Sequence, residues 1–209
     1  MKAHKLLSVL LAVLILLCTA VPTLAAEKKG PAFQNEIPAG YSGTWNDNGY
    51  TLVVTDGKVT GGQPEVIDLA VKTLNKSGWD LKSAYNWCLK NMTYTRKNQD
   101  NNGGLGVEQY ALNGFKTKTG NCWTYASCLY YMGKLLGEDI HVVKGEVPYA
   151  NGSYGPHAWN EVIRDGKTYV IDADFELARK KNGKKPNNGY MFQYKTKGTW
   201  KYRNISRVN

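Results

Sequence analysis

The sequence predicts an α+β protein in which several helices come first along the chain and an antiparallel sheet follows. Two observations lead to this prediction. From Pro64 to Gly137 the apolar residues mostly recur at helical spacing. From Ile140 to Asp172 they alternate with polar residues, as in half-buried strands, and a turn divides the run. After an N-terminal leader the chain has the length of one domain, so we expect a single hydrophobic core.

The leader, residues 1–25, has the parts of a signal peptide. Lys2 and Lys5 form a basic start, and Leu6 to Leu17 is apolar but short for a membrane span. Small residues at its end form a cleavage site. We therefore expect an exported protein, secreted or held at the cell surface, with no transmembrane segment in the mature chain. The alternatives are an uncleaved anchor and lipidation at Cys18, which the bulky residue before it disfavours.

Lysine and arginine outnumber aspartate and glutamate by 27 to 17, which gives a net charge of +10. Loss of the leader removes Lys2 and Lys5 and leaves +8. Such a chain is attracted to anionic cell-wall polymers, acidic proteins or membrane surfaces, although the charge equally serves solubility alone. We expect a protein or peptide substrate, with the cell wall as a candidate location. The export signal and the lack of a nucleic-acid motif argue against nucleic acid, and the oligomeric state is left open.

Residues 26–62 are expected to form an N-terminal extension, and residues 63–209 the main domain. Thr51 to Val54 is rich in β-formers, and Asp56-Gly57 predicts a tight turn, so the extension should carry a short β-hairpin. The first helices of the main domain are predicted over Pro64–Lys76, Asp80–Asn91 and Val107–Phe115. In the tail, strands are predicted over Tyr190–Tyr194 and Thr199–Tyr202.

A polar loop before the third helix partly resembles a calcium-binding loop. Asn98, Asp100, Asn102 and Gly103 fall at the offsets of ligands one, three, five and of the turn glycine. The first position lacks a carboxylate, however, and the twelfth is Gln109 instead of glutamate. The histidines and cysteines also lack zinc-site spacing. We therefore expect no metal and no cofactor.

The segment TGNCWTYA, Thr119 to Ala126, places Cys122 at the start of a helix. Gly120 and Asn121 form a turn, and the apolar residues that follow recur at helical spacing up to Gly137. The first turn of a helix carries unpaired N–H groups and the positive end of the dipole, and both favour a thiolate. Cys122 is therefore a candidate nucleophile, and the alternative is a buried, inert cysteine.

A β-hairpin is predicted around the turn Asp165-Gly166. Its two strands are predicted over Gly155–Ile163 and Lys167–Asp172. Counting the pairs outward from the turn brings Glu161 next to Tyr169 or Val170. The same count brings His157 close to Asp172, so that a carboxylate can orient the imidazole while the other ring nitrogen faces a thiol.

Two residues compete for these roles. Asp174 is a second carboxylate near the end of the returning strand. His141 is a rival base, although it lies in a predicted strand with no turn to expose it.

These motifs resemble the transglutaminase-like superfamily. The resemblance rests on GNCWTYASCLYYMGKLLGEDIHVVKGE followed by HAWNEVIRDGKTYVIDAD, and it covers roughly Val107 to Phe175, with a weaker similarity before it. The resemblance implies a papain-like fold and a Cys-His-Asp triad, whose nucleophile, base and orienting carboxylate correspond to Cys122, His157 and Asp172. The chain departs from the family where Asp174 stands, since many members have Pro-Thr there.

The resemblance further implies acyl transfer through a cysteine thioester on peptide or protein amides. Water as acceptor gives a cysteine peptidase or amidase, and a primary amine gives a protein-crosslinking transglutaminase. The alternative is a non-catalytic extracellular or cell-wall binding module on the same fold. The backbone N–H of Cys122 is a natural oxyanion donor. The second donor is open, with Trp87, Gln109 and Tyr110 as candidates.

Three cysteines remain after loss of the leader, an odd number for an exported chain. A Cys88–Cys128 disulfide that leaves Cys122 free suits an oxidising compartment. Burial of Cys88 and Cys128 as plain thiols between helices is the other interpretation.

Overall fold

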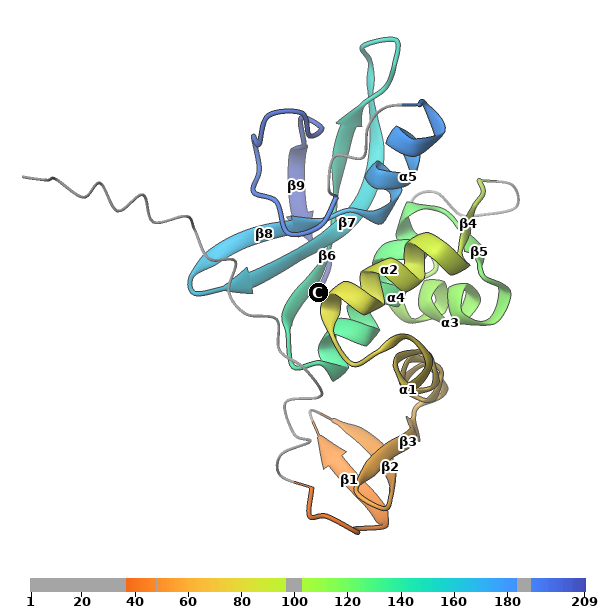
Figure 1. Ribbon diagram of the computed structural model, residues 1–209. Helices are drawn as coiled ribbons and strands as arrows, with labels where there is room; N and C mark the ends of the chain where they lie inside the picture. The colour runs from red at the N-terminus through yellow and green to blue at the C-terminus, as the bar shows by residue number, and fades with distance from the viewer. Residues whose placement is uncertain (1–36, 48, 97–102, 184–188) are drawn as a thin grey trace, which may run out of the picture.

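The computed structural model describes residues 37–47, 49–96, 103–183 and 189–209. A four-stranded antiparallel sheet, in the order β8-β7-β6-β9, forms one half of the molecule. Helix α4 packs on β6 and β7, and the other N-terminal helices pack around α4 (Figure 1). The predicted α+β class, with N-terminal helices packed on an antiparallel sheet, is confirmed.

A small sheet lies at the opposite end of the molecule from the hairpin of β6 and β7 (Figure 1). Its strands are β1 (Gly43–Asp47), β2 (Tyr50–Thr55) and β3 (Lys58–Gln63). The predicted hairpin is present as β2 and β3, and β1 adds a strand that the sequence analysis does not contain. Leu52, Val54 and Val59 join the main core through α1. Gly62 permits this close approach, because a Cβ there would lie 2.5 Å from a methyl of Ile67.

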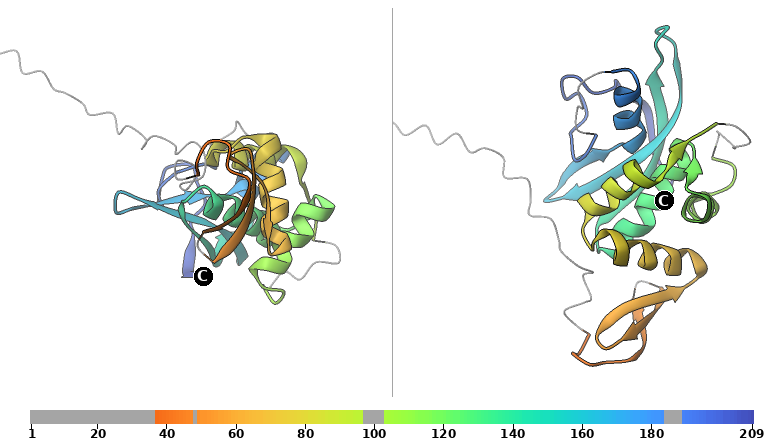
Figure 2. Two further views of the ribbon diagram at one scale, coloured as in Figure 1. Left: turned by 90° about the horizontal axis from the view of Figure 1, so that it is seen from below. Right: turned by 45° about the vertical axis from the view of Figure 1, so that its right-hand side comes forward.

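The first three helices form the frame around α4. They are α1 (Glu65–Ser77), α2 (Leu81–Asn91) and α3 (Val107–Thr117), close to their predicted bounds. Asp80 caps α2 by accepting a hydrogen bond from the backbone N–H of Ser83 at 2.8 Å. The right-hand view of Figure 2 shows α1 lying between the small sheet and the rest of the molecule. A short parallel pair, β4 (Thr93–Tyr94) and β5 (Thr119–Gly120), leads the chain into α4.

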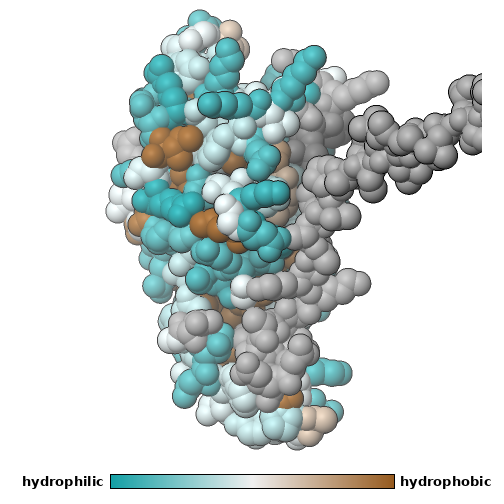
Figure 3. Space-filling view, turned by 90° about the vertical axis from the view of Figure 1, so that its left-hand side faces the viewer, coloured by the Kyte–Doolittle hydropathy of each residue, from teal (hydrophilic) through white to brown (hydrophobic). Residues whose placement is uncertain are grey.

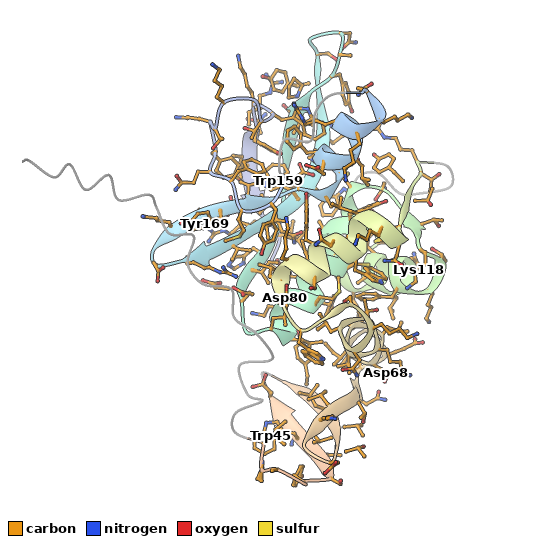
Figure 4. The ribbon with its side chains drawn as sticks, in the orientation of Figure 1. Trp45, Asp68, Asp80, Lys118, Trp159 and Tyr169 are labelled. Atoms are coloured by element: carbon orange, nitrogen blue, oxygen red, sulfur yellow. The ribbon has the colours of Figure 1, made fainter. Side chains whose placement is uncertain are left out.

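The central helix and the main sheet complete the domain. Their bounds are α4 (Cys122–Leu135), β6 (Asp139–Pro148), β7 (Tyr154–Arg164), β8 (Lys167–Ile171) and β9 (Arg203–Arg207). Glu161 pairs with Val170 across the hairpin, which confirms the predicted register. Along β7, Ala158 and Val162 belong to clusters that α4 covers, whereas Trp159 packs with aromatic residues of the C-terminal segment on the other side (Figure 4 labels Trp159).

The C-terminal region differs from the prediction. A helix, α5 (Ala173–Lys181), follows β8 directly. The two tail strands predicted over Tyr190–Tyr194 and Thr199–Tyr202 are wrong: Phe192 makes an isolated bridge to Val170, and the tail strand is β9. Met191 has a φ of 53°, which breaks an extended strand at that point.

On the side shown in Figure 3, the hydrophobic residues of the described part of the chain form small separate patches among hydrophilic ones. Within the described ranges, no helix combines the length and hydropathy that a membrane crossing requires. The predicted signal peptide, and three of the calcium-like positions, Asn98, Asp100 and Asn102, lie outside the described residues.

Candidate active site

Cys122 is the first residue of α4, as predicted from its turn and its helical pattern. The side chain of Asn121 caps the helix by accepting a hydrogen bond from the backbone N–H of Thr124 at 3.3 Å. Gly120 lets the chain turn tightly here, since a Cβ on it would lie 2.2 Å from the Thr124 hydroxyl. Cys122 itself is buried, with only 7% of the residue exposed.

His157 and Asp172 form a buried hydrogen-bonded pair. The imidazole Nε2 lies 2.8 Å from Asp172 Oδ2, and both side chains are at most 4% exposed. Asp172 is also the N-cap of α5, where its Oδ1 accepts from the backbone N–H of Phe175 at 2.9 Å. A third donor, the hydroxyl of Tyr202, lies 2.7 Å from Oδ2. The carboxylate is therefore fixed at both oxygens.

The thiol of Cys122 is the remaining hydrogen-bond partner of His157. Because Nε2 is occupied by Asp172, the sulfur faces Nδ1. Burial alone would lower the pKa of His157, but the charge and hydrogen bond of Asp172, followed by those of Cys122, outweigh it and raise the pKa well above its ordinary value. The structure thus brings together the three residues that the sequence analysis selected, in an arrangement that favours an imidazolium beside a sulfur.

Asp174 lies on the same side of the ring as Cys122. Its Oδ2 is 3.8 Å from Nδ1 of His157, a longer contact than the one made by Asp172. Burial raises the pKa of Asp174 to about 6, an effect that the charge of His157 reduces and that of Asp172 increases. Asp172, and not Asp174, therefore holds the nitrogen opposite the thiol.

A cleft of about 420 Å³ opens beside His157 and Asp174. Aromatic and aliphatic side chains form most of its walls, and Arg96 and Lys181 add positive charge. Of the loop tyrosines before His157, Tyr149 lines the cleft. The lining residues are Tyr94, Arg96, Val147, Pro148, Tyr149, Pro156, His157, Asp174, Leu177, Ala178, Lys181, Asn182 and Trp200.

Asn160 connects the helix of the thiol to the sheet of the imidazole. Its side-chain amide donates to the backbone carbonyl of Ala126 on α4 at 3.0 Å and to that of His141 on β6 at 3.3 Å. The amide is buried, so these hydrogen bonds are shielded from water. One side chain therefore ties the two halves of the site together.

His141 lies away from the site and is therefore not a rival to His157 as the base. Its Nδ1 contacts the carbonyl oxygen of Asn209 at 2.7 Å, and its Nε2 contacts Asp139 at 3.0 Å. Two of the candidate oxyanion donors are also engaged elsewhere. Gln109 donates to Asn113 at 3.2 Å, and Trp87 packs against Phe115 under the ammonium of Lys118.

The third candidate, Tyr110, does share a cluster with Cys122. Its ring stacks on Trp123 with centroids 5.7 Å apart, and its hydroxyl accepts from the backbone N–H of Gly103 at 3.2 Å. The phenol therefore serves as an acceptor toward this loop.

All three cysteines in the described part of the chain are free thiols, including Cys88 and Cys128. Burial raises the pKa of Cys88 to about 12, and it raises the pKa of Cys128 well above the ordinary value. These two thiols are packed between helices, and Cys128 donates to the carbonyl oxygen of Ala111. Among the described residues, no cluster of His, Cys, Asp or Glu is arranged to hold a metal ion.

The C-terminal segment contributes to the site in a way that the sequence motifs do not predict. Trp200 stands edge-on to the ring of His157, with centroids 5.1 Å apart, and Tyr202 reaches Asp172. The high density of aromatic residues after residue 189 was the available signal, because exposed loops seldom carry so many large side chains. Tyr94, which lines the cleft and accepts from Arg96 at 3.0 Å, is a further residue that the analysis does not select.

The cysteine at the start of α4, the histidine of β7 and the aspartate that follows β8 are arranged as in a papain-like fold. Residues 69–173, half of the chain, match the sequence model of the transglutaminase-like superfamily. The protein belongs to this superfamily, and the resemblance noted in the sequence is confirmed. No curated protein matches the sequence.

Several solved structures are similar to part of the chain. One is a candidate cysteine protease from Cytophaga hutchinsonii, with 15% identity, a TM-score of 0.39, and coverage of 50% of this chain and 35% of that one. A TGase has 21% identity, a TM-score of 0.42, and coverage of 63% and 35%. The arylamine N-acetyltransferase NAT3 of Bacillus cereus has 20% identity, a TM-score of 0.35, and coverage of 44% and 39%. This chain therefore spans little more than a third of the length of each.

Proposed function

We propose that this protein is an exported enzyme that transfers acyl groups from peptide or protein amides through a thioester on Cys122. The observation that carries the proposal is the placement of a helix-start thiol against a histidine whose far nitrogen is bound to Asp172. In this proposal Cys122 is the nucleophile, His157 the acid and base, and Asp172 the orienting carboxylate.

In the first half-reaction the Cys122 sulfur attacks the amide carbonyl carbon. The developing oxyanion accepts from the backbone N–H of Cys122, which is unpaired within the helix because it belongs to the first turn. The C–N bond then breaks, and the nitrogen leaves with the proton of the His157 imidazolium, as an amine or ammonia. The products of this step are a thioester and a neutral imidazole.

In the second half-reaction the neutral imidazole accepts a proton from the incoming nucleophile. The nucleophile attacks the thioester carbon and the S–C bond breaks. This step regenerates the Cys122 thiolate and the His157 imidazolium. Water yields a carboxylic acid, which makes the enzyme a cysteine peptidase or amidase. A primary amine yields a new amide, which makes it a protein-glutamine acyltransferase. In this proposal the acceptor enters through the cleft beside His157 and Asp174.

The test measures both the reactivity of the thiol and the product. Iodoacetamide at neutral pH should alkylate Cys122 well before Cys88 and Cys128, as mapped by peptide mass spectrometry. A mixture of extracellular proteins is then incubated with a labelled primary amine. Release of amine or ammonia without label incorporation identifies hydrolysis, whereas incorporation at glutamine identifies transfer. Cys122→Ala should abolish either product, and Cys128→Ala is the matched control that should retain it.

A non-catalytic binding module on the same fold predicts a different result. In that case Cys122 should label no faster than the buried thiols, and Cys122→Ala should behave like the wild type in every assay. Either outcome would remove the acyl-transfer proposal.

A further inference from the structure

Tyr202 contacts the orienting carboxylate directly, although it lies thirty residues beyond it in the chain. Its hydroxyl is 2.7 Å from Asp172 Oδ2, the oxygen that also lies 2.8 Å from Nε2 of His157. The residue also lies outside the segment 69–173 that the superfamily model matches. The contact is therefore supplied by a part of the chain whose role the family resemblance does not address.

The hydroxyl of Tyr202 acts as a donor. Burial raises the pKa of Tyr202 well above its ordinary value, and the charge of Asp172 raises it further. The phenol thus keeps its proton near neutral pH, and the carboxylate oxygen of Asp172 is the acceptor. Its ring is held in place by Trp159, with centroids 4.7 Å apart, and by Tyr194 at 5.7 Å.

The two oxygens of Asp172 are held by different parts of the fold. Oδ1 accepts from the backbone N–H of Phe175 in the first turn of α5, and Oδ2 accepts from His157 and Tyr202. Without the phenol, only the imidazole would restrain Oδ2, and the carboxylate could turn with the ring about its hydrogen bond at Oδ1. With the phenol, the position of Oδ2 is set independently of the ring that it has to orient.

We propose that Tyr202 is a positioning residue for the acyl transfer, because its hydroxyl fixes Asp172 Oδ2 so that His157 keeps Nδ1 directed at Cys122. This inference rests on the proposed function of these three residues. It assigns a role in the reaction to the C-terminal segment. The edge-on contact of Trp200 with the His157 ring comes from the same segment and also restrains the ring.

Tyr194 provides a matched control. It lies in the same segment, and its hydroxyl also donates to a buried carboxylate, Glu161 Oε1, at 2.6 Å. It accepts from the indole of Trp159 at 2.8 Å, and no hydrogen bond joins it to Asp172. Tyr194→Phe therefore removes a similar hydrogen bond from the same region while the orienting carboxylate keeps all its donors.

The test uses the full chain and needs no substrate, since it follows the rate at which iodoacetamide alkylates Cys122. Tyr202→Phe should slow this rate by about tenfold at neutral pH, as expected for the loss of one hydrogen bond to a buried charge. Tyr194→Phe should stay within about twofold of the wild type. Circular dichroism at the assay temperature verifies that each variant is folded.

A double-mutant cycle separates positioning from a general loss of packing. Asp172→Asn keeps an oxygen for the cap of α5 but removes the charge that Tyr202 acts on. In the Asp172→Asn background, Tyr202→Phe should have little further effect, because the two residues act as one unit. If the two effects multiply, Tyr202 has a structural role only, and the proposal is overturned.

Two further results have distinct meanings. If wild-type Cys122 is no more reactive than Cys88 and Cys128, this proposal and the proposed function both fail. If Cys122 is reactive and Tyr202→Phe leaves its rate unchanged, only this proposal fails. Should Tyr202→Phe not fold, NMR of the wild type replaces it: a slowly exchanging Tyr202 hydroxyl proton close to the His157 ring is expected, and a rapidly exchanging one overturns the proposal.

Discussion

Replacing Asp174 by asparagine should stabilise the protein near neutral pH. Burial is the main reason that the pKa of Asp174 rises from the ordinary value of 3.8 to about 6, and Asp172 adds to it. Such a rise corresponds to about 3 kcal/mol by which the folded state disfavours the ionised carboxylate. The side chain is only 14% exposed, so screening by solvent removes little of this cost. Asparagine has the same shape without the charge.

Part of this gain is offset by the position of Asp174 in the helix. It belongs to the first turn of α5, where a negative charge interacts favourably with the helix dipole by about 0.5 kcal/mol. The favourable contact with His157 is already contained in the pKa of about 6. We therefore expect Asp174→Asn to raise the free energy of unfolding by about 2 kcal/mol above pH 7.

The pH dependence gives this prediction its sign. Because the pKa in the folded state is higher than in the unfolded state, the stability linked to Asp174 is complete below about pH 4 and is lost as the pH rises through about 6. Urea denaturation of the two proteins should therefore differ above pH 7 and agree near pH 4. Asp165→Asn, in the exposed hairpin turn, is the control and should change little at either pH.

The reasoning is refuted if Asp174→Asn is no more stable than the wild type above pH 7. It is also refuted if the gain is equally large near pH 4, since a change in packing rather than in ionisation would then be responsible.

Two other substitutions test the packing that positions the site. Arg164 forms a two-pronged ion pair with Glu138, with contacts of 2.7 and 3.1 Å, and Glu138 is 3% exposed. Arg164→Met should therefore cost about 3 kcal/mol in urea denaturation by leaving a buried charge unpaired, and an unchanged midpoint would contradict this. Gly120→Ala would place a Cβ 2.2 Å from the hydroxyl of Thr124 and should displace the start of α4 at a cost of about 2 kcal/mol. A fully stable variant with wild-type Cys122 alkylation would show that the turn tolerates a side chain.

Local sequence patterns predict most of the framework. The turn before Cys122 places it at a helix start because Asn121 supplies the cap, a short-range interaction. The Asp165-Gly166 turn sets the hairpin register, and the register in turn brings His157 to Asp172. These features depend on residues close together in sequence or on one well-defined turn, so periodicity and turn chemistry are sufficient to find them.

Helix α5 was not predicted because Asp172 was interpreted only as the end of a strand. The same carboxylate caps the helix, and acidic residues in the first turn with basic residues in the last are ordinary helix signals. The two strands predicted in the aromatic tail are wrong for a different reason. Its β-like composition reflects burial against Trp159 and Phe175 rather than strand pairing. No local rule predicts that Tyr202 returns to Asp172, because that contact depends on how the whole chain folds.

The side chain of Asn160 has a consequence for how a substrate could enter. Its amide binds a carbonyl of α4 and a carbonyl of β6 at once. Helix α4, which carries the Cys122 sulfur, and the sheet, which carries the His157 ring, should therefore move together as one body. Widening the entrance to the nearly enclosed sulfur is then left to the opposite rim, the turn between β6 and β7 and the exposed side of α5. Any opening would then take place there, while Asn160 keeps the helix of Cys122 and the sheet of His157 together.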